Sequence, residues 1–176
     1  VARHENEISG TTDVADRPEF ARLRTTKSID GVQVSGWFTE DFTLAELKTL
    51  RAQERLPQVR PDNTRYDGRF EVPTFVEVLR LVRTWEKKLG TKIGVAPETK
   101  HPTYFESIGL DQTKPLLRSL RKVGWDRSSS PVIIQSFETT NLKRLARLTR
   151  VPLAQLTSAS GAPYDLPTPS SPYTPY

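Results

Sequence analysis

The sequence predicts an α/β fold built from parallel strand–helix–strand units. Three segments have the spacing of amphipathic helices, short runs of β-type residues lie between them, and the connections are only a few residues long. The length of 176 residues is enough for one domain with a substantial core. Cysteine is absent, which excludes a disulfide scaffold, thiolate metal ligands and a cysteine nucleophile.

The N-terminal part of the chain does not show this alternation of strands and helices. Residues 1–4 look like the end of a strand, and residues 5–70 are predicted to form a long loop or insertion with Gly and Pro at turn positions. An alternating stretch at residues 32–34 indicates a small hairpin within it. A short helix is expected after Thr43, because this side chain can form a capping box with Glu46.

The remaining elements follow from periodicity and from start and stop signals. Amphipathic helices are predicted over residues 74–89, 113–123 and 140–149. Strands are predicted over residues 92–96, 132–137 and 151–156. Residues 1–163 therefore form the expected domain, and residues 164–176 a disordered Pro-rich tail, because repeated Pro prevents both helix and central strand.

The net charge of +5 raises the question of a nucleic-acid partner. The basic residues are scattered among acids, and the densest group falls on the polar face of the helix predicted at 140–149. That group is Lys143, Arg144, Arg147 and Arg150. A solvated helix face explains it better than a phosphate-binding stripe, so no nucleic-acid partner is expected. No apolar run approaches the about 18 residues of a membrane span, so no stable membrane insertion is expected.

The segment 92–102 carries the most chemical information. Side chains alternate between the faces of a strand, so Glu98 and Lys100 share the face that carries two small residues before them. Function concentrates at this end of strands in parallel α/β folds. Glutamate can ligate a hard cation and lysine can neutralise a phosphate, but a surface Glu–Lys pair remains an equal alternative. His4, at the end of the first expected strand, is either a structural histidine or a general acid or base.

Five short motifs resemble those of the glycerophosphodiester phosphodiesterases, most closely the bacterial secreted or periplasmic type. They are VARHEN at 1–6, TTDVAD at 11–16, PTF at 73–75, PETK at 97–100 and QSF at 135–137. The resemblance implies a partial TIM (β/α)8 barrel, with about strands three to six and their helices. It also implies metal-dependent hydrolysis of a small glycerophosphodiester to glycerol 3-phosphate and an alcohol, with Ca²⁺ or Mg²⁺ as cofactor, in a secreted or periplasmic protein.

The resemblance also implies a role for individual residues. His4 matches a family histidine that acts in acid–base catalysis, Glu98 a metal-ligating glutamate, and Lys100 a lysine placed near the substrate phosphate. Substrate-pocket roles are expected for Gln135, Phe137 and Glu5, the last of which stands where many members have Asp.

Two family motifs are absent from the sequence. The His-Arg-Gly motif and the Glu-x-Asp metal pair would precede Val1, and the chain has no methionine. We therefore expect an inactive or nearly inactive fragment with about four of the eight barrel strands. Two alternatives stay open: a related phospholipase D-like phosphodiesterase, and a non-catalytic anion-binding module that uses the basic helix or the Pro-rich tail.

Overall fold

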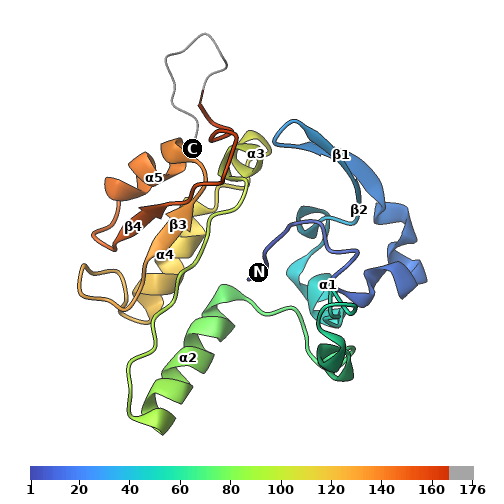
Figure 1. The fold of residues 1–176 in the computed structure, drawn as a ribbon, viewed down its shortest axis with the longest axis horizontal. Coiled ribbons are helices and arrows are strands. Elements are labelled where there is room, and N and C mark those ends of the chain that lie inside the picture. The colour runs from blue at the N-terminus through green and yellow to red at the C-terminus, as the bar shows by residue number, and fades with distance from the viewer. Residues whose placement is uncertain (167–176) are drawn as a thin grey trace. The chain divides into compact units, whose positions relative to one another are not determined.

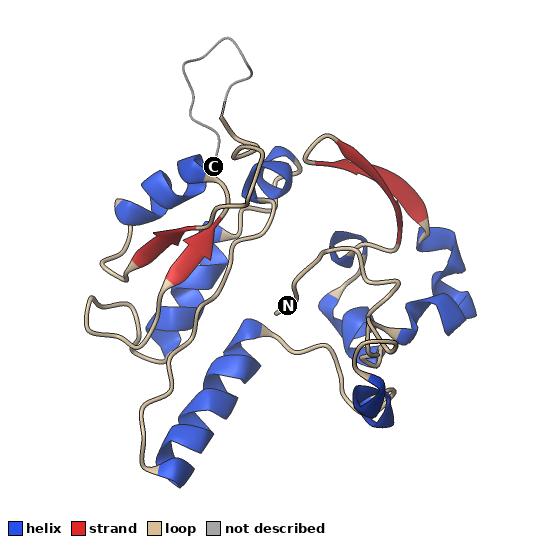
Figure 2. Cartoon of the chain, in the orientation of Figure 1, coloured by secondary structure: helices blue, strands red, loops and turns tan. Residues whose placement is uncertain are grey.

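The computed structural model describes residues 1–166, and the chain divides into two compact units. The first unit comprises residues 1–74 and the second begins at residue 75; each is described by itself. Figure 1 shows the order of the elements and Figure 2 their secondary structure. The greater part of the Pro-rich tail, residues 167–176, lies outside the described residues.

The first unit is built from short elements. Its regular elements are β1 (Thr25–Ile29), β2 (Val32–Gly36) and α1 (Leu44–Thr49), with 3-10 helices at Asp13–Asp16, Pro18–Leu23, Thr39–Asp41 and Pro61–Tyr66. Residues 1–4, where the sequence predicts the end of a strand, form no strand; Ala2 N donates instead to the carbonyl of Pro73 at 2.8 Å. The region expected as a long loop thus contains a hairpin and several short helical turns.

Two local sequence signals in this unit are confirmed. Strands β1 and β2 pair antiparallel and are joined by Asp30-Gly31, both with positive φ (48° and 80°). This backbone is that of a tight hairpin turn, which the Asp-Gly dipeptide favours. Helix α1 begins with the expected capping box, in which Thr43 Oγ1 accepts from Glu46 N at 3.2 Å and Thr43 N donates to Glu46 Oε2 at 2.7 Å.

Side chains that bond to backbone groups hold the rest of the first unit together. Its buried core consists of Ile8, Val14, Phe20, Trp37, Phe42, Leu47, Leu50 and Val72. Trp37 Nε1 donates to the carbonyl of Phe20 at 2.7 Å, and Arg51 N donates to Asp13 Oδ1 at 2.7 Å. The Glu7 carboxylate packs against Gly36 so closely that a Cβ atom at this position would displace it. These contacts follow neither a helical nor a strand period, and for that reason the sequence pattern of this region predicts a loop.

The second unit alternates helices with parallel extended segments. Its elements are α2 (Phe75–Leu89), α3 (Pro102–Ser107), α4 (Thr113–Lys122), β3 (Ile134–Ser136), α5 (Thr139–Ala146) and β4 (Leu153–Gln155). Strands β3 and β4 are parallel, with Gln135 opposite Ala154. Residues 95–99 continue this ladder on the other side of β3, since Val95 pairs with Val132 and Glu98 with Gln135, both parallel. The α/β class is thereby confirmed for this unit.

The apolar faces of the helices pack on the ladder. The buried core is formed by Leu79, Leu117, Leu120, Trp125, Val132, Ile134, Leu142, Leu145 and Val151. The three long helices lie within a few residues of their predicted ranges. Helix α3 was not expected: it has six residues, too few to show a helical period, and it is anchored by the buried side chains of Pro102 and Phe105. No helix within residues 1–166 is long and apolar enough to cross a membrane.

Candidate functional site

Four of the six residues predicted for a site meet at the carboxyl end of the parallel ladder. Glu98 is the bridge partner of Gln135, and the backbone bonds on either side, Gln135 N to Pro97 O and Thr99 N to Gln135 O, both measure 2.9 Å. One pair further along, Lys100 Nζ lies 5.9 Å from the centre of the Phe137 ring, within the range of a cation–π contact. The register therefore places an acid and a base next to an amide and an aromatic ring.

Thr99, between Glu98 and Lys100, is buried in a hydrogen-bonded network. Its side chain points away from the two charged residues, as strand alternation requires, and only 3% of the residue is exposed. Thr99 Oγ1 donates to Asn141 Oδ1 at 2.7 Å, and Ser136 Oγ donates to the Thr99 carbonyl at 3.0 Å. Asn141 Nδ2 in turn donates to Thr113 Oγ1 at 3.2 Å. This buried network restrains the backbone that carries Glu98 and Lys100.

A buried carboxylate holds the turn that follows Lys100. Glu138, 3% exposed, accepts hydrogen bonds from Thr103 at both the backbone N (3.0 Å) and the hydroxyl group. A carboxylate at the first turn of a helix satisfies its unpaired N–H groups and interacts favourably with the helix dipole, here that of α3. Gln112 Nε2 also donates to the carbonyl of Lys100 at 3.1 Å. Hydrogen bonds thus restrain the backbone both at Lys100 and in the turn that follows it.

A second carboxylate from a distant part of the chain holds the start of α5. Asp165 accepts from Thr139 N at 3.1 Å, from the Thr139 hydroxyl at 3.2 Å and from Thr140 N. Partial burial tends to raise the pKa of Asp165, but the hydrogen bonds from Thr140 and Thr139 outweigh it and leave the pKa below its ordinary value. Because α5 begins just after Phe137, the segment after β4 supports the same end of the ladder.

His4 and Glu5, the other two predicted residues, belong to the first unit. His4 Nδ1 lies 2.7 Å from Glu5 Oε1, and 63% of the histidine side chain is exposed. A carboxylate next to one ring nitrogen favours the tautomer that carries its proton there, which leaves the other nitrogen, Nε2, to exchange protons with a partner. The exposed side chain of His4 is therefore open to solvent at Nε2.

The described residues provide few ligands for a metal. Glu98 offers the hard oxygen donor that Ca²⁺ or Mg²⁺ prefers. Within residues 1–166, however, no three or more His, Asp or Glu side chains gather in a way that could hold a metal ion. The donor chemistry at Glu98 suits such an ion, but the part of the chain described by the structure does not complete its coordination shell.

Sequence reasoning did not identify the residues that support the site. Glu138 carries a partial signal, since an acid directly after a predicted strand stands where functional groups gather. Asn141 and Asp165 carry none, because their partners lie 42 and 26 residues away along the chain. Only the folded arrangement reveals them.

Comparison with known proteins gives a consistent set of matches. The model of the glycerophosphoryl diester phosphodiesterase family matches residues 1–170. Similar proteins include glycerophosphodiester phosphodiesterases of Arabidopsis thaliana (32% identical, covering 86% of this chain), Haemophilus influenzae (28%, covering 82%) and Treponema pallidum (31%, covering 80%). The match covers 42%, 40% and 39% of these relatives, so the chain spans about two fifths of their length.

Proposed function

The chain belongs to the glycerophosphoryl diester phosphodiesterase family, and on that premise we propose that it serves the hydrolysis of glycerophosphodiesters to glycerol 3-phosphate and an alcohol. The observation that carries the proposal is the pairing of Glu98 and Lys100 with Gln135 and Phe137 at the carboxyl end of a parallel ladder. In α/β barrels this end carries the catalytic groups.

We propose further that the second unit is part of a (β/α)8 barrel. Residues 95–99, β3 and β4 would be its fourth, fifth and sixth strands, an assignment supported by their parallel order and by the helices that connect them. Residues 1–4, counted as the third strand from the sequence, form no strand in the structure. The third strand of the barrel is therefore not assigned to these residues.

The proposed roles follow the chemistry of each side chain. Lys100 would offset the negative charge of the phosphodiester as a compact cation, and such preorganised charge stabilises the charge that develops in the transition state. The substrate's own glycerol hydroxyl would attack phosphorus and lose its proton to the histidine of the His-Arg-Gly motif, which this sequence lacks. His4, in its doubly protonated form, would give a proton to the oxygen of the departing alcohol, and water would then open the cyclic phosphate to glycerol 3-phosphate. Glu98 would supply one carboxylate to a Ca²⁺ or Mg²⁺ ion. Residues 1–166 do not complete the ligand set of that ion.

A chimaera tests this function. Residues 1–170 of this chain would replace the matching stretch of the Arabidopsis thaliana phosphodiesterase, and release of glycerol 3-phosphate from glycerophosphocholine would be measured. We expect activity in the chimaera, and a loss of about 10²-fold or more in kcat/KM on Glu98→Gln. Residues 1–176 alone are expected to release little or no product.

A matched control makes this result specific. Glu106→Gln removes the same charge from an exposed position on α3 and should leave kcat/KM within about twofold. Full activity in a folded Glu98→Gln chimaera would remove Glu98 from the proposed site. A preference for sphingomyelin over glycerophosphocholine would favour the phospholipase D-like alternative instead.

A further inference from the structure

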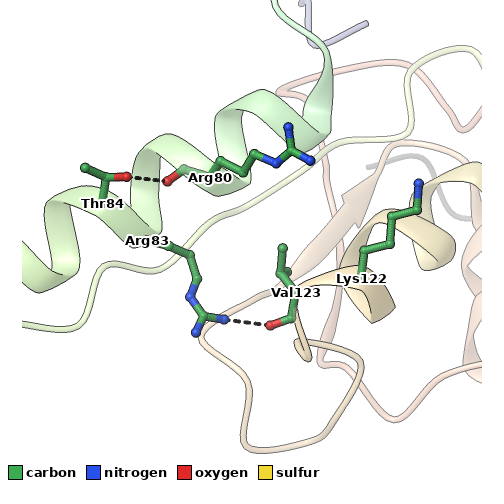
Figure 3. Close-up of a pocket in the computed structure, with 5 residues that line it drawn as sticks. All are labelled: Arg80, Arg83, Thr84, Lys122 and Val123. Carbon is green, nitrogen blue, oxygen red and sulfur yellow. Dashed lines mark hydrogen bonds between the residues drawn. The ribbon is translucent and has the colours of Figure 1, made fainter.

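A basic pocket lies on the helical side of the second unit, away from the candidate site. It has a volume of about 470 Å³ and is lined by Arg80, Arg83 and Thr84 of α2 and by Lys122 and Val123 at the end of α4 (Figure 3). Helix α4 has ten residues and begins at Thr113, whose hydroxyl belongs to the network beneath Glu98 and Lys100. The pocket is thus at the opposite end of α4, about 15 Å along its axis.

Positive charge in the pocket is concentrated and uncompensated. Three of the five lining residues are cationic, and none is an acid. Within residues 1–166, no carboxylate forms an ion pair with Arg80, Arg83 or Lys122. Cations gathered in a concave surface raise the local concentration of anions more than the same charges spread over a flat one.

One of the three cations is held in place before any ligand arrives. The Arg83 guanidinium donates to the carbonyl of Val123 at 2.7 Å (Figure 3). It also lies over the ring of buried Trp125, 5.7 Å from its centre. These contacts use part of its donor set and leave the other N–H groups available. A preoriented guanidinium loses less side-chain entropy on binding. Thr84, in contrast, already donates to the carbonyl of Arg80 at 3.0 Å, so the cations are the donors left for a ligand.

We propose that this pocket binds a phosphate group, as a second anion site separate from the candidate active site. Phosphate combines up to two negative charges with several acceptor oxygens, which matches two guanidinium groups and one ammonium group. A carboxylate has one charge and two oxygens and would leave a cation unpaired. The phosphate belongs either to a small phosphomonoester or to the phosphomonoester headgroup of a lipid such as phosphatidic acid, and both present the same chemistry to the pocket.

The test compares the chain with a pocket variant and a control of equal charge. Inorganic phosphate is titrated into residues 1–176 and binding is followed by the NMR signals of the arginine side chains. Arg80→Gln/Lys122→Gln removes two of the three exposed cations of the pocket, whereas Lys143→Gln/Arg150→Gln removes two exposed cations elsewhere on the same unit. We expect the pocket variant to bind phosphate at least about tenfold more weakly, equivalent to about 1.4 kcal/mol, and the control to change less than about twofold.

A vesicle arm distinguishes the source of the phosphate. Vesicles of phosphatidylcholine alone and of phosphatidylcholine mixed with phosphatidic acid are sedimented with each variant. Pocket-dependent binding to the mixed vesicles only, with none to inorganic phosphate, assigns a lipid headgroup; pocket-dependent binding of inorganic phosphate assigns a small molecule. Equal weakening of the pocket and control variants, or no binding in either arm, overturns the proposal. Circular dichroism confirms that each variant is folded.

Discussion

The two units of the chain are stabilised in different ways. The second unit satisfies its backbone through helices and a parallel ladder, and it buries one face of α2, α4 and α5 in a single apolar core. The first unit has only short elements, and side chains such as Asp13 and Trp37 complete its backbone hydrogen bonding around a separate core. Apolar truncation should therefore damage the second unit most, and loss of single polar groups the first.

The largest effect is expected from a cavity in the second unit. Leu120 is fully buried, and Leu120→Ala should lower the free energy of unfolding of this unit by about 2–5 kcal/mol, because both transfer energy and packing are lost. Leu148→Ala is the control, since that side chain is 46% exposed. Amide hydrogen exchange should show the loss in residues 75–166 and not in residues 1–74. Equal loss in both parts would mean that they unfold as one.

The converse change removes one polar side chain from the first unit. Asp13 accepts from Arg51 N at 2.7 Å and pairs with Arg17 at 2.7 Å. Asp13→Ala should destabilise the first unit by about 1–3 kcal/mol, since it leaves a partly buried N–H group without its acceptor. Denaturant unfolding of Asp13→Ala and of the exposed control Asp16→Ala measures the difference. If the two variants were equally stable, side-chain–backbone bonding would not organise this unit.

A smaller loss is expected at the start of α1. Thr43→Ala removes one half of the capping box and should cost the first unit about 1 kcal/mol. The exposed Ser28→Ala, in the hairpin, serves as a control for a surface hydroxyl. Amide exchange in residues 44–49 should accelerate in the first variant and stay unchanged in the second. Unchanged exchange in both would show that the cap adds nothing to the helix.

The smallest effect depends on pH and concerns the second unit. The pKa of Asp165 is below its ordinary value of 3.8 in the folded chain, so its stabilising contribution is present above that pH and is lost as the pH falls through the lower folded pKa. Asp165→Asn should therefore be less stable than the parent by about 0.3–1 kcal/mol at pH 7, with the gap closing below pH 3.8. Thermal unfolding across this pH range measures it. A gap independent of pH would exclude a role for the charge.

Much of the second unit could be predicted from sequence, and little of the first. The apolar spacing in α2, α4 and α5 is a local signal, and so is the alternation that places Glu98 and Lys100 on one face. Thr43 with Glu46, and Asp30 with Gly31, are the comparable local signals in the first unit.

What escaped prediction depends on contacts between distant residues. Trp37 donates to the carbonyl of Phe20, and Thr99 donates to the side chain of Asn141. Contacts between residues so far apart in the sequence produce no periodic pattern. A six-residue helix such as α3 is too short to show a helical period. The position of Glu98 and Lys100 at the end of an extended segment could be predicted, whereas the network that holds this segment could not.

The central claim, that the carboxyl end of the parallel ladder handles a phosphodiester, is tested most directly at Lys100. In the chimaera with the Arabidopsis thaliana enzyme, kcat/KM for glycerophosphocholine is measured for Lys100→Met and for the exposed control Lys114→Met. The account predicts a loss of about 10²-fold or more for Lys100→Met and less than about twofold for the control. A folded Lys100→Met chimaera as active as its parent would contradict it.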